Sequence, residues 1–320
     1  MKYLITLLTC ITISMAAEGK IGGVIYFDYA NAEEKSAFNF QRQYFSYTGV
    51  ASDKIDFKII FDVGRTNVGA TIIEKDLSYK SEDTRLVVFL KKAQINYKTS
   101  YGKVSMGLIG TNTYGVQEKN WGYRFIEKSS IDLYKYSSTA DIGIGFSRLL
   151  IENLNINLQV VNGEGYTQPQ GDKYHKISVN TIYGEQKLDN NDGYNAGIVY
   201  STEATDGDPT NMISAFGGFA GMGLRFGAEY DMLTKGDTES SIISVSANYS
   251  FMDNKDIFLR YDMYDGDTSV DKDGSSYIIT GILLSCGNGL SVAPNVRIKS
   301  YENDSKESDE TEYKVNFQFK

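Results

Sequence analysis

The chain has 320 residues and a formal net charge of -9 at pH 7, and it contains 24 Tyr, 16 Phe and 31 Gly but only 3 Pro. This composition favours many strands joined by tight turns over a helical protein, and beyond the N-terminus no run of about 18 apolar residues could form a membrane-spanning helix. The negative charge, without a long basic run, excludes the surface expected of a nucleic-acid-binding protein.

Residues 1–16 have the pattern of a secretory signal peptide. Lys2 supplies the positive start, residues 3–15 are mostly apolar, and the small residues Ser14 and Ala16 form a cleavage site. The mature chain, residues 17–320, would then carry Cys286 as its one cysteine, so an intramolecular disulfide and a metal site made of His and Cys are excluded. An exported chain of this kind needs another source of stability, and a closed hydrogen-bonded barrel would supply it.

Apolar and polar residues alternate along most of the chain, which predicts strands with one apolar and one polar face. Residues 312–320 show it most clearly, with Tyr313, Val315, Phe317 and Phe319 separated by polar residues. The same alternation occurs over residues 55–63, 224–231, 257–263 and 290–299. Large aromatic residues stand at the ends of the apolar faces, which favours a transmembrane barrel over a soluble sandwich.

The sequence predicts sixteen strands, at residues 20–30, 37–50, 54–65, 86–97, 102–110, 138–149, 154–162, 174–184, 194–202, 210–219, 222–232, 240–251, 256–265, 275–285, 290–301 and 312–320. Short turns alternate with long loops, as in an outer-membrane barrel with both termini in the periplasm. Segment 185–193 is long for a periplasmic turn, so 14 or 18 strands remain alternatives. No linker or break in composition divides residues 17–320, and we expect a single barrel wide enough for an aqueous channel.

The longest predicted connector, residues 111–137, is rich in charges and aromatic residues. Trp121, Phe125, Ile126 and Leu133 would prefer burial to water, so the loop should fold onto another surface. Inside the lumen it would set the constriction. The alternative is a loop that packs over the barrel mouth, or on a neighbouring subunit, without controlling transport.

Three segments resemble bacterial outer-membrane porins related to the phosphate-selective group: Phe40 to Tyr47, Lys92 to Tyr97, and Trp121-Gly122-Tyr123-Arg124 with Ser138 to Gly143. The resemblance covers about residues 19–165. It implies a 16-stranded trimeric diffusion channel with an inward-folded third loop. It does not imply phosphate selectivity, because that group lines its pore with arginines and lysines, whereas the inward positions of this chain carry both signs.

Candidate channel-lining and constriction residues follow from the inward parity and from the long loop. They are Arg42, Lys58, Lys92, Glu118, Arg124, Asp141, Arg225, Arg260 and Arg297. We expect Arg124 to project into the narrowest part of the lumen near Glu118 and Asp141.

An enzyme would have to use His175, the one histidine, with Asp172 three residues before it. No serine stands in a recognisable nucleophile setting, so we predict that the protein is not an enzyme. The acidic segments around Asp265, Asp271 and Asp304 lack the spacing of a known calcium loop and are interpreted as solvated turns.

The sequence therefore predicts an outer-membrane porin that admits small hydrophilic solutes and ions by passive diffusion, without a cofactor. Its expected partners are outer-membrane lipid, lipopolysaccharide and two further copies in a homotrimer. The alternative function is an adhesin or structural anchor whose lumen is closed.

Overall fold

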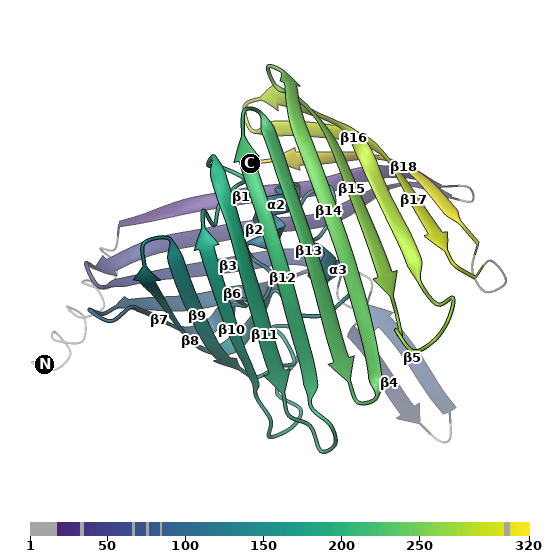
Figure 1. Ribbon diagram of the computed structural model, residues 1–320. Helices are drawn as coiled ribbons and strands as arrows, with labels where there is room; N and C mark the ends of the chain where they lie inside the picture. Colours follow the sequence, from purple (N-terminus) through teal and green to yellow (C-terminus); the bar gives the residue numbers. More distant parts are fainter. Residues whose placement is uncertain (1–17, 33–34, 66–67, 75–76, 84, 304–307) are drawn as a thin grey trace, which may run out of the picture.

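Sixteen antiparallel strands close into one barrel in the computed structural model, which describes residues 18–320 except 33–34, 66–67, 75–76, 84 and 304–307 (Figure 1). The barrel strands are β1 (Glu18–Ala32), β2 (Lys35–Ser52), β3 (Ile55–Arg65), β6 (Leu86–Lys98), β7 (Lys103–Gly110), β8 (Ala140–Ile151), β9 (Leu154–Val161), β10 (Lys176–Gly184), β11 (Gly193–Glu203), β12 (Thr210–Gly221), β13 (Leu224–Lys235), β14 (Thr238–Met252), β15 (Lys255–Asp265), β16 (Ser275–Gly287), β17 (Leu290–Tyr301) and β18 (Glu310–Phe319). Each strand pairs with its neighbours in sequence order, and β1 closes the barrel on β18.

All sixteen predicted strands are confirmed, and segment 185–193 is the connection between β10 and β11. The alternatives of 14 and 18 barrel strands are therefore wrong. The predicted signal peptide, residues 1–16, lies outside the described residues.

The structure adds one hairpin that the sequence pattern did not predict. Strands β4 (Val68–Glu74) and β5 (Leu77–Asp83) pair with each other as a separate two-stranded sheet within the predicted connector 67–85. Each has 7 residues, fewer than the roughly 9–11 that a membrane-spanning strand needs. The hairpin projects from the end of the barrel opposite to the C-terminus (Figure 1).

The outer face of the barrel is apolar, as the alternation predicts. On β15, Leu259 is 49% exposed, whereas its neighbours Phe258 and Arg260 are 2% and 1% exposed. The same parity holds along β18, where Tyr313 and Phe319 face outward and Asn316 is buried inside. Such an extended apolar exterior fits hydrocarbon rather than water.

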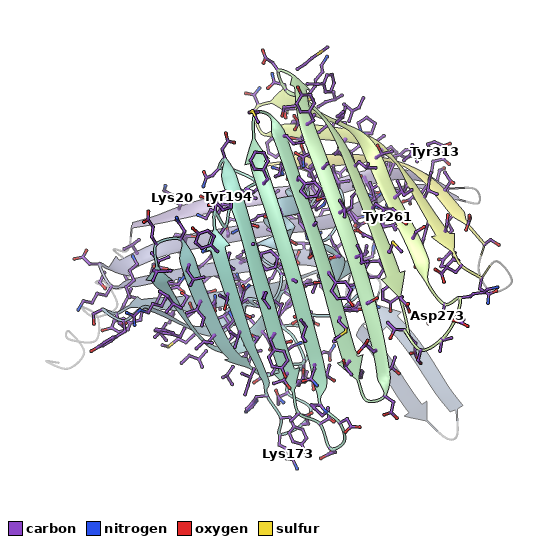
Figure 2. All side chains as sticks on the ribbon, viewed as in Figure 1. Lys20, Lys173, Tyr194, Tyr261, Asp273 and Tyr313 are labelled. Atoms are coloured by element: carbon purple, nitrogen blue, oxygen red, sulfur yellow. The ribbon has the colours of Figure 1, made fainter. Side chains whose placement is uncertain are left out.

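Outward aromatic side chains gather toward both ends of the strands. Near the short-turn end they are Tyr97, Tyr183, Tyr194, Phe226, Tyr249 and Phe319; toward the long-loop end they are Phe38, Tyr200 and Tyr313. Between them lie aliphatic side chains such as Ile198, Val245 and Leu259. Tyr194, Tyr261 and Tyr313 are labelled on the outer surface in Figure 2. This order matches the aromatic girdles of a transmembrane barrel.

Two short helices lie inside the barrel, α2 (Gln117–Trp121) and α3 (Ser130–Leu133) (Figure 1). Both belong to the connection between β7 and β8. Over the part of the chain that the structure describes, none of the helices is long and apolar enough to cross a membrane.

We expect Leu259→Arg to lower the free energy of unfolding by about 2–4 kcal/mol, because it places a charge against lipid near the middle of β15. The control is Lys58→Leu, at an exposed inward position of β3, which should change that free energy by less than about 0.5 kcal/mol. Urea unfolding in lipid vesicles measures both. Equal losses would mean that the two faces are assigned wrongly.

Candidate channel constriction

The third loop, residues 111–139, folds into the barrel and follows its inner wall. The side chains of Asn120 and Asn195 on β11 exchange two hydrogen bonds of 2.9 Å each. Farther along, the Asn316 amide on β18 donates to the carbonyl of Phe125 at 3.1 Å. The hydroxyl of Tyr136 donates to Ser240 on β14 at 2.8 Å. These contacts place the loop against the wall at β11, β14 and β18. The ring of Tyr26 on β1 also packs against Phe125, with centroids 6.3 Å apart.

Apolar residues of the loop are buried against the inner wall. Trp121, Phe125 and Ile126 are 3%, 7% and 4% exposed and form a cluster with Phe258 and Ile279. The Trp121 and Phe258 rings meet edge to face, with centroids 6.1 Å apart. The preference of these side chains for burial thus draws the loop inward.

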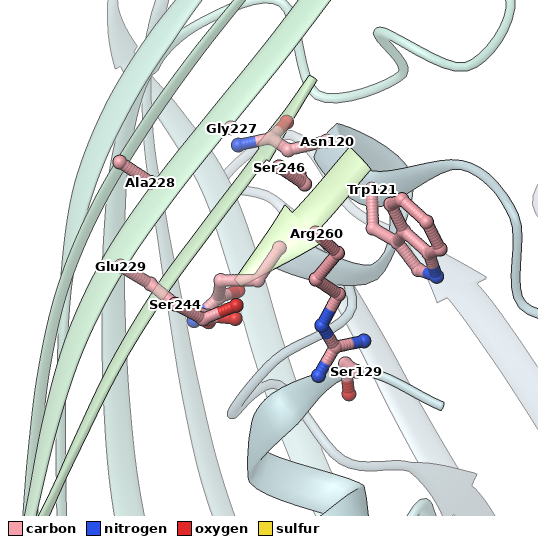
Figure 3. Close-up of a pocket in the computed structure, with 10 residues that line it drawn as sticks. Asn120, Trp121, Ser129, Gly227, Ala228, Glu229, Ser244, Ser246 and Arg260 are labelled. Atoms are coloured by element: carbon pink, nitrogen blue, oxygen red, sulfur yellow. The ribbon is translucent and has the colours of Figure 1, made fainter. Parts of the chain in front are cut away.

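Arg260 and Arg297 hold the loop in place, and the loop buries Arg260. Arg260 on β15 forms an ion pair of 2.6 Å with Asp262, donates to the carbonyl of Lys128 and lies under the Trp121 ring. Figure 3 shows it extending toward the loop beside Trp121 and Ser129. The sequence correctly placed this arginine inside the barrel, but the prediction that it lines the channel is wrong because the loop covers it.

Arg297 on β17 has the same role near the end of the aromatic cluster. It pairs with Glu127 at 2.7 Å and donates to the carbonyl of Ile126 at 2.6 Å. Burial alone would raise the pKa of Glu127, but the Arg297 guanidinium and the Lys128 amide lower it below its usual value. The loop is therefore held by a buried charged pair, and Arg297 also lines a cavity of about 120 Å³ together with Arg42 and Arg124.

Asp141 does not meet Arg124 as expected. It is 1% exposed, and its carboxylate accepts from the backbone amides of Gly163 at 2.7 Å and Gly165 at 3.3 Å. Asp141 therefore shapes the connection between β9 and β10, and the prediction that it lines the constriction is wrong.

Arg225 on β13 faces a different part of the lumen. Its guanidinium lies over the Tyr123 ring at 4.9 Å, and it lines a cavity of about 390 Å³ toward the short-turn end, with Asp256 and Lys320. This position is a vestibule rather than the constriction.

The remaining candidates meet between the loop and strands β2, β3 and β6. Arg124 pairs with Glu118 at 3.2 Å and with Asp132 at 3.4 Å. Across from them, Arg42 on β2 pairs with Asp62 at 2.9 Å. Arg42 and Arg124 both line a cavity of about 120 Å³. Their side chains are 28% and 20% exposed, so both reach water in the lumen.

Lys91 is a lining residue that the alternation missed. The register between β3 and β6 shifts at this residue, so Lys92 opposes Ile60 and Leu90 opposes Phe61. This bulge directs both lysines inward, whereas strict alternation would point Lys91 at lipid. Its ammonium lies 3.2 Å from the Tyr44 hydroxyl and 3.8 Å from Asp62. Lys58 and Lys92 occupy neighbouring inward positions on β3 and β6.

The surroundings of Glu118 and Arg124 shift the pKa values of these two loop residues for different reasons. Burial raises the pKa of Glu118 above that of an ordinary glutamate, although Arg124 opposes the shift. Burial works against the charge of Arg124, but Tyr44, Glu118 and Asp132 raise its pKa above the usual value. Arg124 therefore stays charged at any ordinary pH, while Glu118 gains a proton more readily than other glutamates.

The residues considered for catalysis do not form a site. His175 is exposed, and Asp172 instead accepts from the Gln170 amide at 2.9 Å and from the Tyr174 backbone at 2.7 Å. Among the described residues no group of three His, Cys, Asp or Glu side chains is placed to hold a metal ion.

No family model matches the sequence, and no curated protein sequence matches it. Solved structures match over nearly their whole length. The trimer form of OmpT, an outer membrane protein of Vibrio cholerae, has a TM-score of 0.64 at 11% identity and covers 95% of this chain and 99% of its own. The outer membrane channel DcaP of Acinetobacter baumannii has a TM-score of 0.65 at 10% identity, with 95% and 97% covered. The anion-selective porin from Comamonas acidovorans has a TM-score of 0.59 at 11% identity, with 94% and 99% covered.

The chain has the fold of the bacterial outer-membrane porins. This confirms the predicted fold class and the coarser part of the resemblance. The structural likeness extends to several kinds of porin and does not single out the phosphate-selective group. At these identities it establishes the fold, and the activity has to be argued from the side chains in the lumen.

We expect Glu127→Gln to lower the free energy of unfolding by about 1–3 kcal/mol at pH 7, because Arg297 loses its charged partner. The folded pKa of Glu127 is lowered, so the pair stabilises the protein above the unfolded value of about 4.3 and this stabilisation is lost as the pH falls through the folded pKa. Urea unfolding at several pH values should show the two proteins converging in acid. The control Glu152→Gln, at an exposed turn, should match the parent throughout, and a pH-independent gap for Glu127→Gln would contradict the assignment.

Proposed function

We propose that the protein is an outer-membrane porin, a water-filled channel for the passive diffusion of small hydrophilic solutes and ions. The observation that carries this proposal is the facing set of partly exposed charges inside the barrel, Arg42 on the wall and Glu118 and Arg124 on the loop. Charged side chains in a lumen need water around them, and a hydrated passage narrowed by a loop selects solutes by size and charge.

The constriction favours anions. The charged residues that line its cavity are Arg42, Arg124, Lys128, Arg297 and Lys314, against Asp28 and Glu127. Lys91 and Lys92 add two positive charges from β6, while Asp62, Glu118 and Asp132, which pair with Arg42 and Arg124, add three negative ones. Positive charges remain in excess, seven to five. A local cationic excess in a narrow passage attracts negative ions even though the whole chain has a net charge of -9.

The remaining parts of the proposal concern the environment of the channel. Residues 1–16 would direct export and be removed, and the single barrel domain of residues 17–320 would insert in the outer membrane beside lipopolysaccharide. A homotrimer is supported by the trimer form of OmpT among the similar structures. N-terminal sequencing of the mature protein and migration of the unheated protein on a gel test these two points.

Arg124→Glu should shift the reversal potential toward cations in a salt gradient, because a charge in a narrow, low-dielectric passage is little screened. Planar-bilayer recording measures this shift together with the single-channel conductance. The control Lys173→Glu changes a side chain that is 74% exposed in the loop between β9 and β10, and it should leave both quantities unchanged.

Arg124 also pairs with Glu118 and Asp132, so its loss could act by loosening the loop. That role predicts a larger conductance at an unchanged reversal potential. An unchanged reversal potential in a folded Arg124→Glu channel would therefore remove this residue from the selectivity filter. Well-folded parent protein that passes no current would instead support the closed-lumen anchor.

Lowering the pH should increase the anion preference of the parent channel. Because burial raises the pKa of Glu118, this residue loses its negative charge at a higher pH than an ordinary glutamate. Reversal potentials of the parent and of Glu118→Gln, measured from pH 7 downward, should converge as Glu118 becomes neutral. A difference that stays constant over this range would contradict the assignment of Glu118 to the ion pathway.

A further inference from the structure

The connection between β10 and β11 is unusual for its end of the barrel. It has eight residues, 185–192, whereas the other short-turn connections have two, as at 222–223, or four, as at 99–102. A short hairpin turn would join β10 to β11 equally well. The extra length is therefore not needed to connect the two strands, and it requires a separate explanation.

This turn enters the lumen and meets the third loop. Its Leu188 is only 2% exposed. A Cβ added to Gly218 on β12 would lie 2.6 Å from the Asn120 side-chain nitrogen and 2.9 Å from a Leu188 methyl group. Asn120 on α2 and Leu188 of the turn thus pack against the same glycine. A larger residue at position 218 would displace one of them.

One buried side chain joins the two segments. The Asn195 amide nitrogen donates to the Asn120 side-chain oxygen at 2.9 Å and to the carbonyl of Glu185 at 2.7 Å. Its oxygen accepts from the Asn120 amide at 2.9 Å. Asn120 and Asn195 are 3% and 4% exposed. Both amide hydrogens of Asn195 are therefore used, one on the loop and one on the turn, in a place with little access to water.

We propose that the turn at residues 185–192, together with Asn195 on the adjoining strand β11, positions the constriction loop, with Leu188 and Asn195 as the positioning residues. It supports α2 from the short-turn end while the buried arginines hold the following part of the loop. Glu118 and Lys119 directly precede Asn120 on this helix, so the support also fixes constriction charges. The proposal rests on the proposed porin function, and the expected effect is on how long the channel stays open.

The test compares Leu188→Ala and Asn195→Ala with the matched control Asn190→Ala, which changes an exposed residue of the same turn. Losing one net hydrogen bond or the apolar contact should raise the closed-to-open ratio at a fixed voltage about tenfold. The control should match the parent. Adding Asn120→Ala to Asn195→Ala should have little further effect, because the two residues share one interaction.

Hydrogen exchange supplies a readout that does not need conduction. The amides of Glu118, Asn120 and Gly122 bond to carbonyls within the loop, and they should exchange faster in both variants than in the parent and in Asn190→Ala. Parental gating and parental exchange in both variants would overturn the proposal. Faster exchange with a silent parent channel would refute the porin function alone and leave the coupling between turn and loop in place.

Discussion

Complete pairing of backbone hydrogen-bonding groups is the constraint on which the rest of this structure depends. A strand against hydrocarbon cannot leave N–H and C=O groups unpaired, so the sheet must close. Here β1 pairs with β18 over Ile25 to Asn31, and the stacked rings of Phe27 and Phe317 lie across that seam. Closure at sixteen strands makes the barrel too wide for wall side chains to fill. Part of the remaining space inside the barrel is occupied by a loop of the chain itself.

Two different kinds of contact hold the third loop inside the barrel. Its apolar residues pack against Phe258 and Ile279, while its backbone carbonyls accept from Arg260 and Arg297. Each arginine also has a carboxylate partner, Asp262 or Glu127, which offsets the cost of burying its charge. Removing either member of a pair would leave the other as a buried charge without its partner. These ion pairs therefore favour a single position of the loop.

The sequence predicted the wall well because alternation reports directly which face of a strand meets lipid. It could not report what covers the other face, so Arg260 was assigned to the channel although the loop buries it. Lys91 was not predicted to face the lumen, because a bulge breaks the period of two at that residue. The sequence showed that residues 185–193 are long for a periplasmic turn. It could not show that Leu188 is buried, because that contact depends on Gly218, which is more than twenty residues away.

The charge of the constriction illustrates why net charge is a poor guide to the selectivity of a channel. Acidic residues such as Asp172, Asp206 and Asp271 lie exposed in the connecting loops, where salt screens them over about 8 Å. The cations of the constriction stand in a passage bounded by the loop and the wall, with less water to screen them. A chain of -9 can therefore present a positive potential to an ion in transit. In the proposed channel, the ion preference would depend on Arg42, Arg124 and the β6 lysines far more than on the many carboxylates outside.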